Sequence, residues 1–220
     1  MMRNRAVPVV CALLLGPLFG CVSLRRTDEA RFFVLRAQAL LASGDLSEAR
    51  IGLVGLMPVR LPGYLNRPQL VVQDGPNQVL VDEFVRWAEP LEPALTRVVA
   101  ENLATLLSDR QVVLSPFPAG AALHCRVVVE VESFAPQKSG EVRLEGRWTL
   151  LAPADARALV RREFRLRRGP VPMGAGGMVD AQAGTAAMSG LLFDLAEQIA
   201  EGVRQVQVPE GNRPHPPAIK

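Results

Sequence analysis

The amino-acid sequence predicts an α+β domain with two layers, in which two amphipathic helices pack on one face of a mostly antiparallel sheet. Two segments place apolar residues at helical spacing. About seven further segments alternate or run apolar between turn residues, as strands do. Three of these strand segments follow one another directly in the second half of the chain, and their alternation of apolar and charged residues indicates a meander with one wet face.

Two strands are expected early in the chain, at 31–37 and at 51–59. Both segments are apolar, and the second is closed by Pro58. The segment between them, 38–50, contains the turn residues Ser-Gly-Asp. A short helix and a disordered insertion both fit this segment.

A loop and a hairpin are expected next. Residues 60–69 hold two prolines and a glycine, which favour an irregular loop. Residues 69–83 consist of two apolar runs around Asp-Gly-Pro-Asn, and this pattern predicts a β-hairpin.

The first helix is predicted over 89–109, where a proline in the first turn needs no N–H partner. The second helix is expected to follow the Gly-rich stretch 169–184. The apolar stripes of the two helices are Leu91, Leu95, Val98, Asn102, Leu103, Leu106 and Leu107 in the first, and Met188, Leu191, Leu192, Leu195, Ile199 and Val203 in the second.

The second half of the chain carries the longer strands. One begins in 111–116, and the meander comprises 123–134, 141–151 and 158–168. The residues expected to face inward from the last two strands are Val142, Leu144, Trp148 and Leu150, followed by Phe164 and Leu166.

The first 20 residues have the pattern of a secretory signal: a basic start, an apolar run too short to span a bilayer, and a small residue at the end. The end, Leu18-Phe19-Gly20-Cys21, resembles the bacterial lipobox. Cys21 is therefore expected to become the first mature residue and to carry acyl chains such as palmitate. The alternative is a plain signal peptide with a coincidental cysteine. Val22 favours sorting to the outer membrane.

Removal of residues 1–20 leaves 200 residues, which suits one domain. We expect a tether at 21–30, the folded domain at 31–207, and a disordered tail at 208–220 that is rich in proline and polar residues. Lys+Arg falls from 25 to 23 while Asp+Glu stays at 22, so the mature net charge is near +1. This balance gives no electrostatic support for nucleic-acid binding.

Residues that carry chemistry are scarce. The two histidines, His124 and His215, have no Cys or His neighbours at metal-ligand spacing, so no metal site is expected. The Gly-rich residues 174–177 lack the Lys-Ser/Thr of a phosphate-binding loop. Cys125 is expected to be a buried small apolar residue, and Ser189 a small residue on a packed helix. The sequence predicts no catalytic group and no cofactor.

Two loop segments stand out because each contains an aromatic residue and an arginine. The segment 59–71 holds Tyr64 between two prolines, and 84–95 holds Trp87 just before the first helix. A functional interpretation fits these segments, because loops on a rigid scaffold often carry binding residues. A structural interpretation fits them as well, because Trp87 can pack against the start of the helix. The sequence leaves these two interpretations open.

The segments "GLMPVRLPGYLNRPQLVVQ", "FVRWAEPLEPALTRVVAENLATLL" and "GRWTL" occur in this order between Phe32 and Gln205. In this order they resemble the PqiC-like, ABC-type transport auxiliary lipoproteins. The stretch 37–49 is longer than usual for that family, and Phe32-Phe33 replaces a common tyrosine. The family loop, by match, is Leu61, Pro62, Tyr64, Leu65, Arg67, Pro68 and Gln69, and the helix-entry motif is Arg86, Trp87, Glu89 and Pro90.

The resemblance implies an outer-membrane-anchored periplasmic domain that is not an enzyme. It implies docking to a membrane-spanning protein with MCE domains (PqiB-like), a ring of identical subunits, and phospholipid or another hydrophobic molecule as cargo. Contact with the partner, with a neighbouring subunit or with the core remains open for both motifs. Two other functions are compatible with the residues: a stand-alone lipid-binding lipoprotein and, with much less support, an envelope hydrolase.

Overall fold

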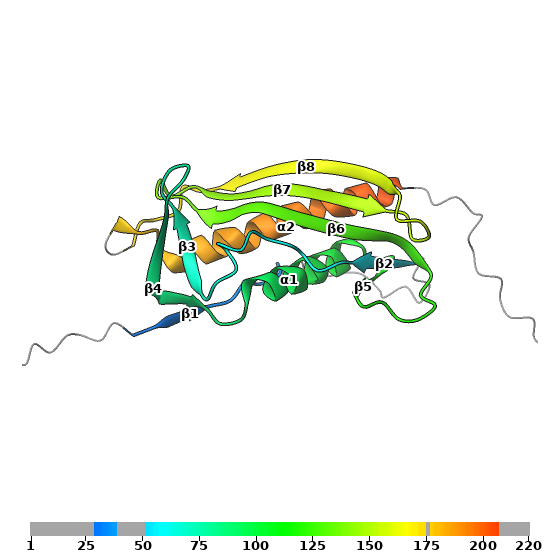
Figure 1. Ribbon diagram of the computed structural model, residues 1–220, viewed down its shortest axis with the longest axis horizontal. Coiled ribbons are helices and arrows are strands. Elements are labelled where there is room, and N and C mark those ends of the chain that lie inside the picture. The colour runs from blue at the N-terminus through cyan, green and yellow to red at the C-terminus, as the bar shows by residue number, and fades with distance from the viewer. Residues whose placement is uncertain (1–28, 39–51, 175–176, 207–220) are drawn as a thin grey trace, which may run out of the picture.

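The computed structural model describes residues 29–38, 52–174 and 177–206 and contains eight strands and two helices (Figure 1). The expected signal segment, Cys21, most of the 38–50 segment and the 208–220 tail lie outside the described residues. The elements in chain order are β1 (Arg31–Phe33), β2 (Leu53–Leu56), β3 (Gln69–Gln73), β4 (Val79–Trp87), α1 (Leu91–Leu106), β5 (Gln111–Leu114), β6 (Leu123–Pro136), β7 (Val142–Leu151), β8 (Ala158–Arg168) and α2 (Ala181–Gln205).

The strands form two sheets rather than the single sheet expected from the sequence. One has five strands in the order β5-β2-β6-β7-β8, and the other has three in the order β1-β4-β3. The two longest ladders, β6–β7 and β7–β8, are antiparallel, which confirms the meander and the α+β class. The parallel pairs are β1–β4, β2–β5 and β2–β6.

The β3–β4 hairpin of the smaller sheet has an irregular register. Between Gln69 and Val71 the pairing shifts, so that β3 advances two residues while β4 advances five. Such an irregularity bends the strand that carries the extra residues. In Figure 1, β4 turns a corner at this end of the molecule, and a single bridge between Gln73 and Gln137 joins the hairpin to the larger sheet.

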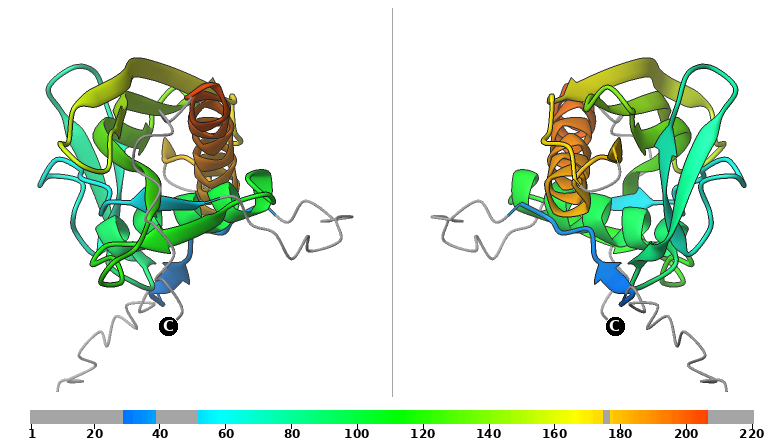
Figure 2. Two further views of the ribbon diagram at one scale, coloured as in Figure 1. Left: turned by 90° about the vertical axis from the view of Figure 1, so that its right-hand side faces the viewer. Right: turned by 90° about the vertical axis from the view of Figure 1, so that its left-hand side faces the viewer.

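The hydrophobic core lies between the five-stranded sheet and the two helices (Figures 1 and 2). All four residues expected to face inward from β7 are fully buried, and Phe164 of β8 is also buried, whereas Leu166 is half-buried. The stripe of α2 is buried throughout, and that of α1 is buried apart from Leu106. None of the described helices is long and apolar enough to cross a membrane.

The second helix begins earlier than the sequence suggested, within the stretch 169–184. Asp180 is the N-cap, and its side chain accepts a hydrogen bond from the backbone N–H of Ala183 at 2.8 Å. A capping carboxylate accepts a hydrogen bond from one of the free N–H groups of the first turn, and its negative charge interacts favourably with the positive end of the helix dipole. Ala181, Gln182 and Ala183 therefore continue as helix in spite of the glycines around them.

Cys125 lies in the core on β6 with no exposed surface, as expected from the sequence. Burial raises the pKa of its thiol to about 11. Because the thiolate is the reactive form, alkylation at pH 8 is expected to be at least about 100-fold slower in the folded protein than in urea. Mass spectrometry of iodoacetamide-treated protein measures both rates, and equal rates would contradict the buried position.

The same pKa shift makes the stability of the fold depend on pH. The thiol keeps its proton in the folded state at pH values where the unfolded chain has already lost it. Its contribution is complete below about pH 9 and is lost as the pH rises toward 11, about 3 kcal/mol in all. Between pH 9 and pH 11, urea unfolding is expected to show a decrease in the free energy of unfolding of the native protein. The Cys125→Ala variant is expected not to show this decrease.

Candidate functional site

The family loop and the helix-entry motif, named above from the sequence, meet in the folded protein. The backbone N–H of Trp87 donates to the carbonyl of Pro68 at 2.7 Å. Gln69 of β3 and Arg86 of β4 are direct partners in the β3–β4 ladder. The hairpin thus brings the end of the loop against the start of the motif that precedes α1.

A row of side chains crosses all three strands of the smaller sheet. Phe32 of β1 is paired with Arg86 of β4, and Arg86 is paired with Gln69 of β3. Paired residues on neighbouring strands point to the same face of a sheet, so these three side chains form one exposed row. Phe32 is 64% exposed, and Phe84, two residues before Arg86, is 42% exposed. Two solvent-exposed aromatic side chains therefore lie next to residues of the two family motifs.

Glu83 orients the polar members of this row. Its carboxylate accepts a hydrogen bond from Gln69 Nε2 at 2.8 Å and lies 3.5 Å from Arg86 Nη2, while its carbonyl accepts from Arg86 Nε at 2.7 Å. Arg67 Nε donates to Gln69 Oε1 at 3.3 Å. Exposed ion pairs contribute at most ~1 kcal/mol, so this network sets side-chain positions more than stability. Within this network two guanidinium groups, of Arg67 and Arg86, accompany the one carboxylate of Glu83.

A shallow pocket of about 280 Å³ lies beside the row, and both motifs line it. Proline rings from each motif stand at its wall, and their restricted backbone keeps the shape of the pocket fixed. Its lining comprises Asn66, Arg67, Pro68, Trp87, Ala88, Glu89, Pro90 and Leu91.

Several family residues support the scaffold rather than its surface. Trp87 is 7% exposed and belongs to the hydrophobic core, as does Leu65, while Leu61 packs against it. The sequence placed Trp87 in a loop, but β4 continues to this residue and turns its indole inward. This corresponds to the structural interpretation that the sequence left open.

Glu89 ties the motif to the first helix. Its carboxylate pairs with Arg97 of α1, and Arg97 also donates to the carbonyl of Leu35 at 3.2 Å. The hydrogen bond that Arg97 donates to the Glu89 carboxylate is the main reason that the pKa of Arg97 is raised, so the guanidinium is charged at every physiological pH. The contacts fix α1, the residues after β1 and the pocket relative to one another.

Tyr64 is not one of the residues that line the pocket. The residue is 42% exposed. Burial of the other part raises the pKa of the phenol, against a smaller opposing effect of the Ser133 hydroxyl, so the phenol is neutral at physiological pH. Pro62 is half-buried in the same turn.

Sequence reasoning missed three residues of this surface: Phe32, Glu83 and Phe84. The predicted hairpin ended at 83, which hid the continuation of β4 and the outward position of Phe84. Phe32 was noted only as a departure from the family pattern. Because 31–37 is expected to be a strand and adjacent strand residues face opposite sides, Phe32 and Phe33 could not both face inward, and this was the available signal.

The described residues contain no group of three or more His, Cys, Asp or Glu that could hold a metal ion. His124 is half-buried on β6, and burial is the main cause that lowers its pKa, followed by the charge of Arg110. Ser189 donates to the carbonyl of Thr185 at 3.0 Å and accepts from the backbone of Arg36. The hydrogen bonds of Ser189 join α2 to the segment after β1, which is a structural role.

Two solved structures with related folds are a protein without an assigned function and a protein from Xanthomonas campestris. The first is 20% identical with a TM-score of 0.62, and the match covers 80% of this chain and 99% of the other. The second is 16% identical with a TM-score of 0.61, covering 79% and 95%. At these identities the likeness extends to the fold. No curated protein matches the chain.

One family matches residues 33–200, and its description is the ABC-type transport auxiliary lipoprotein component. This family is not a known enzyme family, and its description indicates a membrane-anchored lipoprotein that works with a transporter. The match covers most of the chain and includes both motifs at the surface described above. The chain belongs to the ABC-type transport auxiliary lipoprotein family.

Proposed function

We propose that the protein is an accessory lipoprotein without catalytic activity, anchored in the outer membrane through Cys21, that docks onto an MCE-domain (PqiB-like) membrane protein. The observation that carries this proposal is the convergence of the two family motifs on one exposed surface with two aromatic side chains. Aromatic residues and arginine are enriched at protein interfaces and dominate their energy. The cargo of the transporter would be phospholipid or another hydrophobic molecule.

The position of the proposed anchor supports docking by this surface. Seven residues, 22–28, separate Cys21 from Glu29, where the described chain begins, so eight Cα–Cα steps join the two, and β1 starts two residues later. A fully extended segment of this length reaches at most ~29 Å. β1 carries Phe32, so the anchor would hold the exposed row near the membrane at the outer end of a partner that crosses the periplasm.

The proposed docking is tested by reversing one charge in the exposed row. Arg86→Glu is expected to lower the recovery of an MCE protein in a pull-down from detergent-solubilised envelope by at least tenfold. A truncated hot-spot arginine costs ~2 kcal/mol or more, and an introduced like-charge contact adds to this loss. The measurement is quantitative immunoblotting of the partner against the lipoprotein.

Arg165→Glu is the matched control, because Arg165 is an exposed arginine on β8 and lies outside both motifs. It is expected to leave the recovery unchanged. Equal loss in both variants, or no recovery of an MCE protein by the folded native lipoprotein, would count against docking by this surface.

We also propose that copies of the chain form a ring. A collar around a tunnel requires several identical subunits, and closed symmetry is the rule for such assemblies. Light scattering of the purified mature protein, with and without the partner, measures the number of subunits, and a monomer in both samples would contradict the ring.

A second candidate function is binding of a hydrophobic ligand by the lipoprotein alone. The observation that favours it is a separate pocket of about 450 Å³ at the end of the molecule where the small sheet meets the start of α2. Its volume lies in the range of small-molecule sites.

A further inference from the structure

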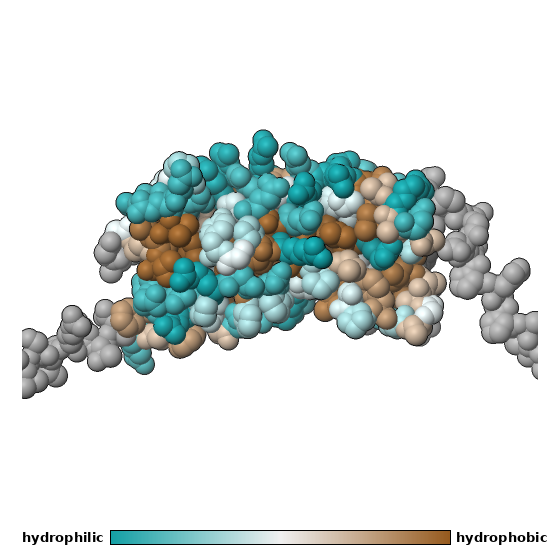
Figure 3. Space-filling model, in the orientation of Figure 1, coloured by the Kyte–Doolittle hydropathy of each residue, from teal (hydrophilic) through white to brown (hydrophobic). Residues whose placement is uncertain are grey.

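The pocket of about 450 Å³ is built by three parts of the chain that are distant in sequence: the segment leading into β1, the β3–β4 hairpin, and the residues that precede and begin α2. Its lining contains no residue of the two family motifs, and it shares Phe84 with the exposed row. Figure 3 shows apolar surface at this end of the molecule, between hydrophilic margins. The apolar part of the lining comprises Leu70, Val72, Phe84, Val85, Met178 and Val179.

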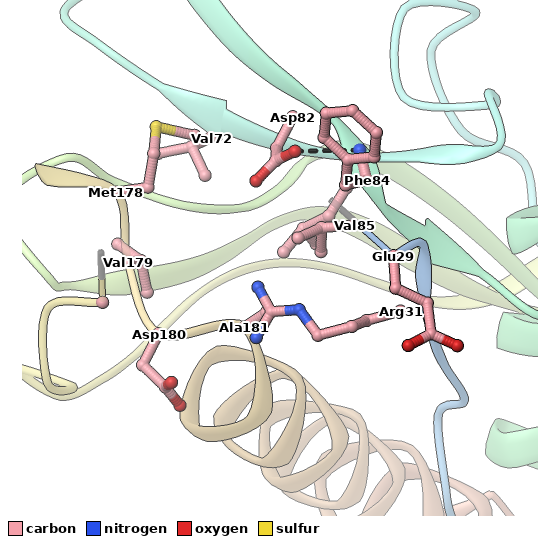
Figure 4. Close-up of a pocket in the computed structure, with 12 residues that line it drawn as sticks. Glu29, Arg31, Val72, Asp82, Phe84, Val85, Met178, Val179, Asp180 and Ala181 are labelled. Atoms are coloured by element: carbon pink, nitrogen blue, oxygen red, sulfur yellow. Dashed lines mark hydrogen bonds between the residues drawn. The ribbon is translucent and has the colours of Figure 1, made fainter. Parts of the chain in front are cut away.

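Arg31 provides the cationic group of the pocket. Its side chain projects into the middle of the space, between β4 on one side and the start of α2 on the other (Figure 4). None of the salt bridges in the described part of the chain involves this arginine. The guanidinium lies 6.0 Å from the ring of Phe33. Its donors are therefore available to an anionic ligand group, next to the positive end of the dipole of α2.

Carboxylates stand around this cation at the wall of the pocket. Asp82 accepts the N–H of Phe84 with Oδ1 at 2.8 Å, and Asp180 accepts the N–H of Ala183 with Oδ1. Each of these bonds uses one oxygen and leaves the charge in place. Glu29 is a third acidic residue of the lining. A ligand that complements the pocket therefore needs a cationic group as well as an anionic one.

We propose that this pocket binds a membrane phospholipid whose headgroup carries a phosphate and a primary amine. Arg31 holds the phosphate, the carboxylate of Asp82 accepts hydrogen bonds from the ammonium group, and the apolar wall of Leu70, Val72 and Met178 covers the start of an acyl chain. An ammonium with N–H donors fits a carboxylate better than a quaternary amine, which has none. The site deepens the second candidate function above and names its ligand class.

The path of the chain places the pocket beside a source of this ligand, a step that rests on the proposed anchor at Cys21. Glu29 and Arg31 belong to the pocket and to the segment that continues from the anchor. The eight Cα–Cα steps from Cys21 to Glu29 keep this end of the pocket within ~29 Å of the anchored residue. A lipid that leaves the bilayer, or arrives at it, passes within reach of this pocket.

The test is native mass spectrometry of the full mature protein, delipidated in a non-ionic detergent and titrated with dihexanoyl-phosphatidylethanolamine. We expect one lipid per protein chain. Arg31→Gln and Asp82→Asn are each expected to weaken binding by about tenfold, because each removes one charge-assisted contact. The side-chain amide introduced by Asp82→Asn retains an oxygen for the N–H of Phe84, which preserves the local fold. Arg36→Gln, an exposed arginine outside the pocket, is the matched control and is expected to bind as the native protein does.

Dihexanoyl-phosphatidylglycerol, which has the phosphate but no amine, is expected to bind more weakly than the phosphatidylethanolamine. Equal binding of the two lipids, an unchanged affinity in Arg31→Gln or Asp82→Asn, or no lipid on the folded protein would each overturn the proposal. Recovery of the MCE partner by Arg31→Gln is expected to stay at the native level. A failure of lipid binding is thereby distinguished from a failure of docking, which Arg86→Glu reports.

Discussion

Replacement of Cys21 by alanine is expected to abolish the incorporation of labelled palmitate completely. In the proposed anchor the Cys21 thiol is the attachment point of the first acyl chain, and no other residue of the lipobox-like segment offers one. Each buried CH₂ contributes ~0.8 kcal/mol to membrane binding, so several chains together anchor a protein essentially for good. Labelling of the purified full-length product, followed by autoradiography, measures the effect.

Cys125→Ala is the matched control for this experiment, because Cys125 is the other cysteine beyond the expected signal and is buried in the core. It is expected to keep the label. A second arm replaces residues 1–21 with an ordinary secretory signal, and the protein should then move from the membrane fraction to the soluble periplasmic fraction. Palmitate on Cys21→Ala, or a membrane-bound product in the second arm, would contradict the proposed anchor.

The helices and the long strands could be predicted because their patterns are local. In β7, alternation alone identified the inward residues, and in α2 the spacing of Met188 through Val203 identified the buried stripe. Each of these patterns records which side of one element faces the core. The inward side of such an element can therefore be identified without knowing which other elements pack against it.

The pairing of the short strands could not be predicted, because it depends on residues far apart in the chain. β1 pairs with β4 across more than fifty residues, and β2 lies between β5 and β6. The irregular register near Gln69, within the small sheet, has no marker in the sequence. These features arise from packing between elements and not from the pattern within any one of them.

The candidate site could be predicted only in part, because some of its features are local in the sequence and others depend on distant residues. The two motifs were recognised as segments, and the hairpin between them made their proximity a natural consequence. Their division into core and surface was not recognisable, because the predicted hairpin ended at 83 and the strand that turns Arg86 and Trp87 to opposite sides was not expected there. The second pocket escaped notice because Arg31, Asp82 and Asp180 come from three separate segments and match no motif.

Gly146→Ala is expected to lower the free energy of unfolding by about 3 kcal/mol or more, and the melting temperature by about 10 °C. Gly146 lies in the middle of β7, where β6 has an irregular register between Val131 and Ser133. A Cβ atom at this position would lie 2.2 Å from the carbonyl oxygen of Glu130 and 2.9 Å from the ring of Phe164. The first of these is backbone held in a ladder, so the strands themselves must separate to admit a methyl group.

Gly63→Ala separates this steric effect from the general effect of replacing a glycine. No atom lies within 4 Å of the Cβ that would be added at Gly63, which is an exposed residue of the family loop. Its stability is expected to stay within about 0.5 kcal/mol of the native value, since the smaller freedom of the unfolded chain slightly favours alanine. Urea unfolding followed by tryptophan fluorescence compares the two variants, because Trp148 is buried on the same strand as Gly146. If both variants unfold at the native urea concentration, Glu130 and Gly146 do not approach each other as closely as this fold requires, and the β6–β7 pair of the meander would have to be paired differently.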